Sequence, residues 1–166
     1  MMHNEELFSE EEFSLFNPAF TGFNLYHGVR EFCSVDGSGM HCALPFILIP
    51  MSLNVSINSM LPSTYRTPIS SWVASNEGLL ATFSLQAESY IPIVRSAFEF
   101  LLSYDLIRLS SSGSFLLGEE SLPVNPRLFN QSHDMKSALK ASRFLGKWFA
   151  HAQSAETIYA QFGVKP

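Results

Sequence analysis

The sequence predicts a mainly α-helical single domain with one small β-hairpin, an α+β fold. Apolar residues recur at helical spacing in several segments that open on a proline or a capping side chain. One pair of apolar runs instead flanks a Ser/Gly turn, which is the pattern of a hairpin. A chain of 166 residues is long enough for one such domain with a well-filled core.

The N-terminal part of this domain is predicted to be a helix, a loop and a buried segment. Asn17 is a suitable N-cap and Pro18 suits the first helical position, which predicts a helix over about 18–32. Two glycines and an aspartate make 34–42 a predicted loop. Residues 43–54 are almost uniformly apolar and contain two prolines, so their pattern leaves helix and strand open and predicts only burial.

Three further helices and the hairpin are predicted next. Thr67 can cap and Pro68 can begin a helix, and a second short helix is predicted over 79–87. After Pro92 the apolar residues repeat at the i, i+3, i+4 spacing of a third helix. The two apolar runs of 106–117 then predict the hairpin.

The order of these elements predicts a winged-helix-like part within the domain. Helix, helix, helix and hairpin follow one another over about 62–118. The single domain is predicted to span 17–166. Residues 1–16 form a separate acidic N-terminal segment, because five of the fifteen acidic residues of the chain lie there.

The last long helix is predicted over about 136–152 and has two different faces. Four cations fall within a narrow arc at 100° per residue, and we call them the basic face: Lys136, Lys140, Arg143 and Lys147. Apolar side chains occupy the opposite side of this helix. The basic face is a candidate surface for nucleic-acid phosphates or an acidic partner, although such a row of charges is most often a solvated face. A short final helix that Gly163 ends is predicted to follow.

The aromatic side chains are candidates for a partner interface. Hydrophobic residues make up 46% of the chain and charged residues only 15%, against about 25% in an average domain. A globule of this size has limited interior, so some apolar surface is expected against a partner. A large core explains the same composition equally well. The candidate interface residues are Phe144, Trp148, Phe149 and Phe162.

Composition also predicts a cytoplasmic protein. The longest apolar run, 43–53, is shorter than the about 20 residues that a membrane helix needs. The N-terminal residues are acidic and lack the hydrophobic stretch of a secretory signal. Cys33 and Cys42 are expected to be reduced, buried thiols.

The sequence contains no recognisable catalytic or metal-binding motif. It lacks GxSxG, P-loop, GxGxxG and HExxH patterns. His41 with the two cysteines offers at most three donors, whereas a structural zinc site needs four. Arg66 is expected to form a structural ion pair rather than to bind phosphate. We therefore expect a protein that is not an enzyme and has no metal or cofactor; a small hydrolase that uses Ser38 or His41 is a third hypothesis.

A DNA-binding function is the alternative that the winged-helix pattern raises. The third helix of such modules enters the major groove with basic and amide side chains. Here its exposed positions offer Arg95 opposed by Glu99, and the hairpin adds only Arg108. A winged-helix transcriptional regulator that depends on these two arginines is therefore the second hypothesis.

Four blocks of the sequence together suggest a family: NPAF (17–20), ALPFILIPMSLN (43–54), LPSTYRTPISSW (61–72) and ASRFLGKWFAHAQSAETIYAQFGVKP (141–166). They resemble the middle component of bacterial three-component ABC-ATPase systems. The last block is the most specific, and the resemblance leaves out the acidic segment 1–16.

This resemblance implies a non-catalytic adaptor subunit. Its partners would be an SMC/Rad50-like ABC ATPase and an effector subunit, a nuclease or another protein. Together they would form a Lamassu-type defence complex against phages and plasmids, in which double-stranded DNA is contacted through the complex and no membrane is involved. The resemblance carries over no catalytic residue.

Overall fold

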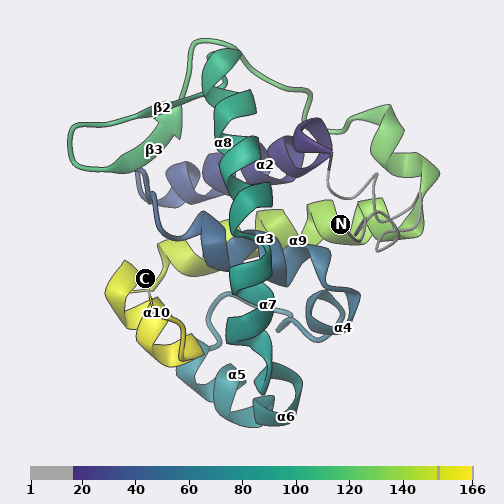
Figure 1. Ribbon diagram of the computed structural model, residues 1–166, viewed down its shortest axis with the longest axis vertical. Helices are drawn as coiled ribbons and strands as arrows, with labels where there is room; N and C mark the ends of the chain where they lie inside the picture. The colour runs from purple at the N-terminus through teal and green to yellow at the C-terminus, as the bar shows by residue number, and fades with distance from the viewer. Residues whose placement is uncertain (1–16, 153, 166) are drawn as a thin grey trace, which may run out of the picture.

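The computed structural model describes residues 17–152 and 154–165, and the acidic segment 1–16 lies outside them. The predicted class is confirmed, because the chain is mainly helical with one small antiparallel sheet (Figure 1). The helices are α2 (Pro18–Val35), α3 (Pro45–Leu53), α4 (Val55–Asn58), α5 (Ile69–Ser75), α6 (Glu77–Leu80), α7 (Phe83–Ser89), α8 (Ile91–Ser103), the 3-10 helix η1 (Arg127–Gln131), α9 (His133–Ala150) and α10 (Ala155–Phe162). The strands are β1 (Met40–His41), β2 (Ile107–Leu109) and β3 (Ser114–Leu117).

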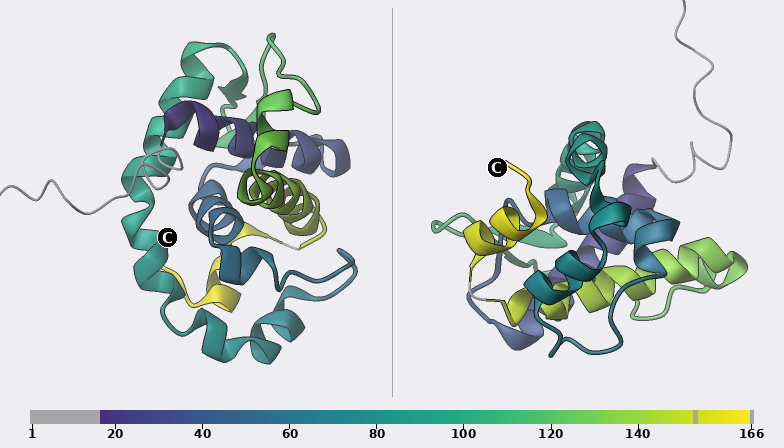
Figure 2. Two further views of the ribbon diagram at one scale, coloured as in Figure 1. Left: turned by 90° about the vertical axis from the view of Figure 1, so that its right-hand side faces the viewer. Right: turned by 90° about the horizontal axis from the view of Figure 1, so that it is seen from below.

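Helices α2 and α9 lie side by side at the centre of the fold and share the largest contact between any two described elements (Figure 2). Their backbones touch where Gly146 of α9 meets Gly28 of α2, and a Cβ at Gly146 would overlap the Gly28 carbonyl group. Helix α8 crosses α2, and α3 packs on α9. The central pair therefore carries α8 on one of its helices and α3 on the other.

The sheet contains one strand more than the predicted hairpin. β2 and β3 pair as predicted, with Ile107 opposite Leu117, and Gly113 adopts a positive φ of 79° in the turn. Met40 in β1 pairs with Phe115, so the strand order is β1-β3-β2. The prediction that 34–42 is a loop was wrong at both ends, because α2 runs to Val35 and β1 begins at Met40. A two-residue strand has no periodicity of its own, so only its partner reveals it. β1 also lies outside the range 62–118 that was assigned to the winged-helix-like part.

The segment 43–54, for which the sequence left helix and strand open, forms the helix α3. Every residue from Ile47 to Leu53 is buried, as predicted, between α9 and α8. A helix that is apolar all round shows no amphipathic period. Its character could therefore not be recognised from spacing.

The remaining helix predictions are largely confirmed, with three differences. Thr67 does not cap α5, whose N-cap is Pro68 without a side-chain bond. The helix predicted over 79–87 is divided into α6 and α7. Helix α9 begins earlier than predicted, because the Ser132 hydroxyl accepts from the Met135 amide at 3.5 Å. Gly163, with φ of 66°, ends α10 as predicted.

The core joins all these layers into one cluster of buried side chains. Its fully buried members include Leu25 of α2, Leu101 of α8 and Trp148 of α9. None of the helices described here is long and apolar enough to cross a bilayer.

Candidate functional site

Helix α9 and the segment before it enclose a groove that gathers three of the four cations of the basic face. We call it the basic groove; its volume is about 510 Å³. Its lining residues are Asn125, Pro126, Phe129, Asn130, Lys136, Leu139, Lys140 and Arg143. Lys136 and Lys140 are exposed, and neither forms an ion pair within 17–152 and 154–165. The groove thus combines an apolar floor with cations that no described carboxylate neutralises.

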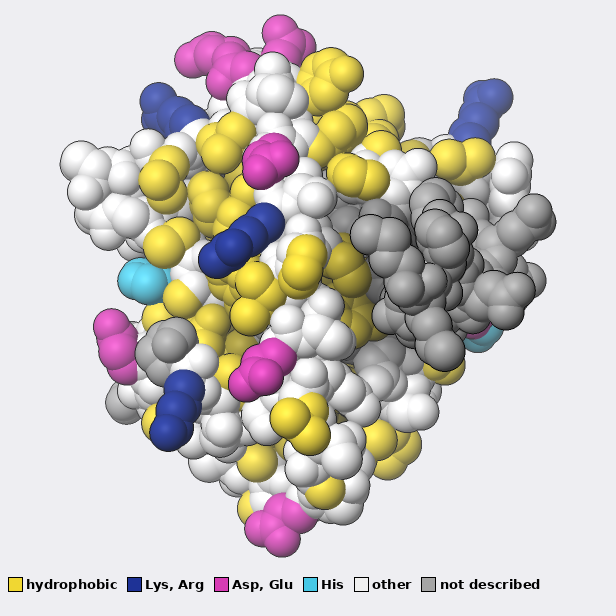
Figure 3. Space-filling view, in the orientation of Figure 1, with side chains coloured by type: hydrophobic (Ala, Val, Ile, Leu, Met, Phe, Trp, Pro, Cys, Tyr) yellow, Lys and Arg dark blue, Asp and Glu magenta, His cyan; other side chains and the backbone are white. Residues whose placement is uncertain are grey.

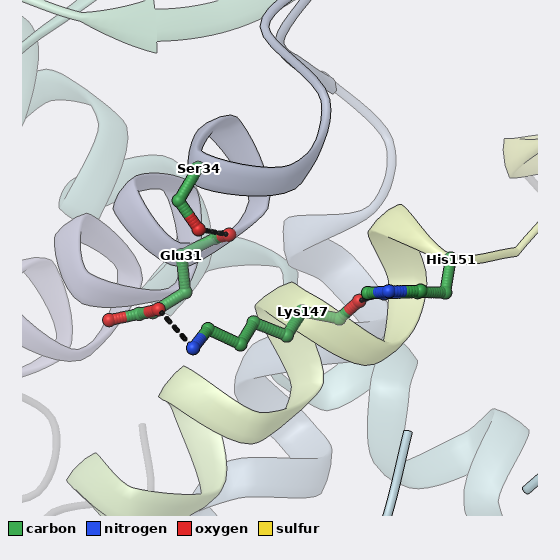
Figure 4. Close-up of polar contacts among 4 residues, drawn as sticks. All are labelled: Glu31, Ser34, Lys147 and His151. Atoms are coloured by element: carbon green, nitrogen blue, oxygen red, sulfur yellow. Dashed lines mark hydrogen bonds and ion pairs between the residues drawn. The ribbon is translucent and has the colours of Figure 1, made fainter. Parts of the chain in front are cut away.

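Lys147, the fourth cation of the basic face, is separated from this groove. Its Nζ lies 3.3 Å from Oε2 of Glu31 on α2 (Figure 4) and 5.8 Å from the centre of the Tyr65 ring. Its backbone carbonyl oxygen is 2.8 Å from Nδ1 of His151. The charge of Lys147 is therefore partly balanced inside the protein, and the predicted face divides into three groove cations and one structural cation.

Arg143 lines the basic groove and also holds the chain segment that precedes η1. Its Nη2 donates a hydrogen bond to the carbonyl oxygen of Val124. Its Nε is buried and has no hydrogen-bond partner among the described residues. A buried donor without a partner costs about 1–3 kcal/mol. Arg143 therefore has a structural role, and its hydrogen-bonding capacity is not fully used.

His27 lies on α2 beside this cation and is only 1% exposed. Burial and, after it, the positive charges of Arg143 and Arg30 together lower the pKa of His27 to about 4, while a hydrogen bond with the backbone of Pro123 acts in the opposite direction. Its Nε2 has no hydrogen-bond partner in the described part of the chain. His27 is therefore neutral near pH 7, and the charge of the basic groove comes from its lysines and arginine.

A second groove, lined mainly by hydrophobic residues, adjoins the basic groove. We call it the apolar groove; its volume is about 370 Å³. It is lined by Asn17, Ala19, Phe20, Phe23, Pro126, Leu128, Phe129 and Met135. Pro126 and Phe129 line both grooves. The Phe129 ring stacks on Phe20 with centroids 5.3 Å apart, so the shared wall is firmly packed.

Helical spacing predicted the cations of the basic groove, but no sequence pattern predicted the opposite wall of the groove. Asn125, Pro126 and Phe129 lie between the predicted hairpin and the helix predicted over 136–152, where the sequence predicted no helix or strand. The local signal there is a pair of apolar residues, Leu128 and Phe129, which begins two positions after Pro126. Two such residues are too few to show periodicity.

Most of the predicted interface aromatics lie in the core. Trp148 is 1%, Phe149 2% and Phe162 7% exposed. The indole Nε1 of Trp148 also donates to the carbonyl oxygen of Thr67 at 2.7 Å. An interface through these three side chains would require them to leave the core, and the structure gives them a packing role instead. Phe144 alone is partly exposed, with its ring centre 5.9 Å from that of Tyr65.

The polar residues considered for catalysis take part in local turns. The Ser38 hydroxyl donates to Asp36 Oδ1 at 2.6 Å, and Nδ1 of His41 accepts from the Ala43 amide at 3.1 Å. Cys33 and Cys42 are free and half-buried, and burial raises the pKa of the Cys33 thiol. Within the described ranges, no three His, Cys, Asp or Glu side chains gather in a way that could hold a metal ion.

The remaining arginines of interest are exposed. The predicted structural ion pair of Arg66 is absent among the residues described, and Arg66 instead lines a cavity of about 370 Å³ with Tyr65 and His151. Arg95 on α8 and Arg108 on β2 both face solvent. The surface around α8 carries mostly hydrophobic and uncharged side chains with isolated charges (Figure 3). Its C-terminal end exposes Leu102 and Tyr104.

Comparison with known protein families identifies a family that covers nearly the whole chain. Residues 6–166 match the family described as ABC-three component (ABC-3C) system Middle Component 3. This range includes most of the acidic segment, which the resemblance noted above had left out. No curated protein and no solved structure matches the chain. The match covers far more than half of the sequence, so the chain belongs to the Middle Component 3 family of ABC-three component (ABC-3C) systems.

Proposed function

We propose that this protein is a non-catalytic adaptor subunit that links the ABC ATPase of its system to an effector subunit. The family match over residues 6–166 carries this proposal, since a middle component implies an ATPase and a further component as partners. The engagement of Ser38 and His41 in local turn hydrogen bonds agrees with a non-catalytic role.

We further propose an SMC/Rad50-like ATPase and a Lamassu-type complex that acts in the cytoplasm against phages and plasmids. The resemblance of the C-terminal block 141–166 supports this finer assignment. Double-stranded DNA would then be contacted through the assembled complex.

The basic groove is the proposed contact for an anionic surface of such a partner or for DNA in the complex. Lys136 and Lys140 project from successive turns of α9, and Arg143 follows on the next turn. Complementary charges of this kind raise association rates and select partners. The apolar floor, which includes Leu139 and Phe129, offers contact area that a phosphate backbone alone would not use.

Co-purification with the ABC ATPase of the same system tests the adaptor role. The wild-type chain is expected to co-elute with the ATPase. Lys136→Glu combined with Lys140→Glu should weaken the complex about tenfold or more, because two favourable charge contacts become repulsive. Lys165→Glu is the matched control, since Lys165 is exposed and lines neither groove. Arg143 is left unchanged because it holds Val124.

A chain that elutes alone in the presence of its ATPase and effector would contradict the adaptor role. A complex that is unaffected by the double charge reversal would show that the basic groove is not the contact.

The second candidate is a winged-helix DNA-binding regulator. The observation that favours it is the exposure of Arg95 and Arg108 on α8 and the hairpin that directly follows. It predicts that the isolated chain binds duplex DNA and that Arg95→Ala or Arg108→Ala weakens binding by about tenfold or more, as the loss of one base contact does. The hydrophobic character of the α8 surface in Figure 3 favours the adaptor over this candidate.

A further inference from the structure

We propose that residues 5–16 of this chain dock across the apolar groove and the basic groove, and so form an internal acidic ligand of the protein. These residues lie outside the described part of the structure. The proposal is carried by their sequence, by the two grooves, and by the place where the described chain begins.

The described chain begins inside the apolar groove. Asn17 lines this groove together with Phe20 and Leu128, and its side chain caps α2 by accepting from the Ala19 amide at 2.9 Å. The cap holds the backbone of Asn17 in an extended conformation, with φ −62° and ψ 124°. The described chain therefore begins at a residue that lines the apolar groove.

The order of side chains in the segment matches the order of the two grooves. Reading backwards from Asn17, the nearest large side chains are apolar: Phe16, Leu15 and Phe13. The next ones are acidic: Glu12, Glu11 and Glu10. The apolar groove begins at Asn17, and the basic groove follows on the far side of the shared wall of Pro126 and Phe129. An extended chain covers about 3.3–3.6 Å per residue, so residues 10–16 span up to about 25 Å, twice the diameter of a helix such as α9.

Charge supports the same arrangement. The basic groove presents Lys136, Lys140 and Arg143 without an ion-pair partner among the described residues, while Lys147 already pairs with Glu31. In an extended segment alternate side chains share a face, so Glu10 and Glu12 would face the cations if the segment crosses the shared wall. A tethered ligand also has an effective concentration in the millimolar range, so weak surface pairs are enough to hold it.

The same groove chemistry would accept an acidic segment of a partner, and the tether is the reason to prefer the chain's own residues. If the basic groove is also the partner contact, which rests on the proposed function, the partner must displace residues 5–16. The docking itself does not depend on that function.

Site-specific photocross-linking in the full-length chain tests the docking. p-Benzoylphenylalanine placed at Phe13 should cross-link to residues of the apolar groove, Leu128 and Met135 foremost. Lys136→Glu combined with Lys140→Glu should reduce this yield about fivefold, whereas Lys165→Glu should leave it unchanged. Cross-links confined to elements other than α2, η1 and α9, or a yield that ignores the double charge reversal, would overturn the proposal.

A competition measurement supplies an independent readout. A fluorescent peptide of residues 4–16 should bind the full-length variant with Glu10→Gln, Glu11→Gln and Glu12→Gln at least about tenfold more tightly than the wild type, because the variant's own segment competes less. Equal affinity for both proteins would overturn the proposal. Both experiments use the isolated chain, so their failure is distinguishable from a failure to co-purify with the ATPase.

Discussion

Replacing Trp148 tests whether the aromatic set of α9 belongs to the core or to a partner interface. Its indole is 1% exposed and meets the Trp72 ring edge-on, with centroids 5.7 Å apart. Its Nε1 donates to the carbonyl oxygen of Thr67 at 2.7 Å, which ties α9 to the chain before α5. Trp148→Ala removes this packing and leaves a cavity, a loss of about 3–5 kcal/mol. The Thr67 carbonyl group, left without its hydrogen-bond donor, adds about 1 kcal/mol to this loss of stability.

A loss of this size is a large share of the about 5–15 kcal/mol that holds a typical domain folded. The free energy of unfolding should be measured by urea denaturation followed by far-UV circular dichroism, which does not depend on tryptophan emission. Trp148→Phe is the matched control: it keeps an aromatic ring, loses the hydrogen bond and part of the volume, and should cost about 1–3 kcal/mol. The reasoning is refuted if Trp148→Ala unfolds at the wild-type urea concentration. If that stable variant also no longer bound its partner, Trp148 would be an interface residue after all.

Two further perturbations probe the contact between α2 and α9. Gly146→Ala should destabilise the fold by about 3 kcal/mol, because the added methyl group meets the backbone of Gly28. Gly78→Ala is the control, because its methyl group faces open space and should change stability by less than about 1 kcal/mol. Equal thermal midpoints for the two variants would argue against the close approach of the two helices. His27 has a pKa of about 4 in the folded chain against 6.5 for a free histidine, so the unfolded state binds more protons between these values. Stability should therefore be complete above pH 6.5 and fall by at most about 3 kcal/mol as the pH drops to 4, and His27→Gln should flatten this dependence in denaturation series at fixed ionic strength. An identical pH profile for both proteins would exclude His27 as its source.

The candidate site was predicted in part from helical spacing. Lys136, Lys140 and Arg143 were found on one face of α9 because helix geometry alone orders positions three and four residues apart. The pattern also put Lys147 on that face, but in the structure Lys147 forms an ion pair with Glu31 on α2. A partner from another element cannot be inferred from the spacing within one helix.

Elements whose signals are local could be predicted from the residues alone. Asn17 with Pro18 marked the start of α2, the apolar spacing after Pro92 marked α8, and Gly163 marked the end of α10. These signals act within one or two turns, through a capping hydrogen bond, a buried stripe or a left-handed residue.

Features that depend on contacts between distant residues could be recognised only in the folded molecule. The strand β1 exists because Met40 meets Phe115, and Trp148 is a core residue because Trp72 of α5 packs edge-on against its ring. The grooves arise where Phe129 of η1 packs on Phe20 of α2 beside the cations of α9. Burial and pairing across the chain are properties of the packed molecule, so composition could predict how much apolar surface must be covered but not which residues would cover it.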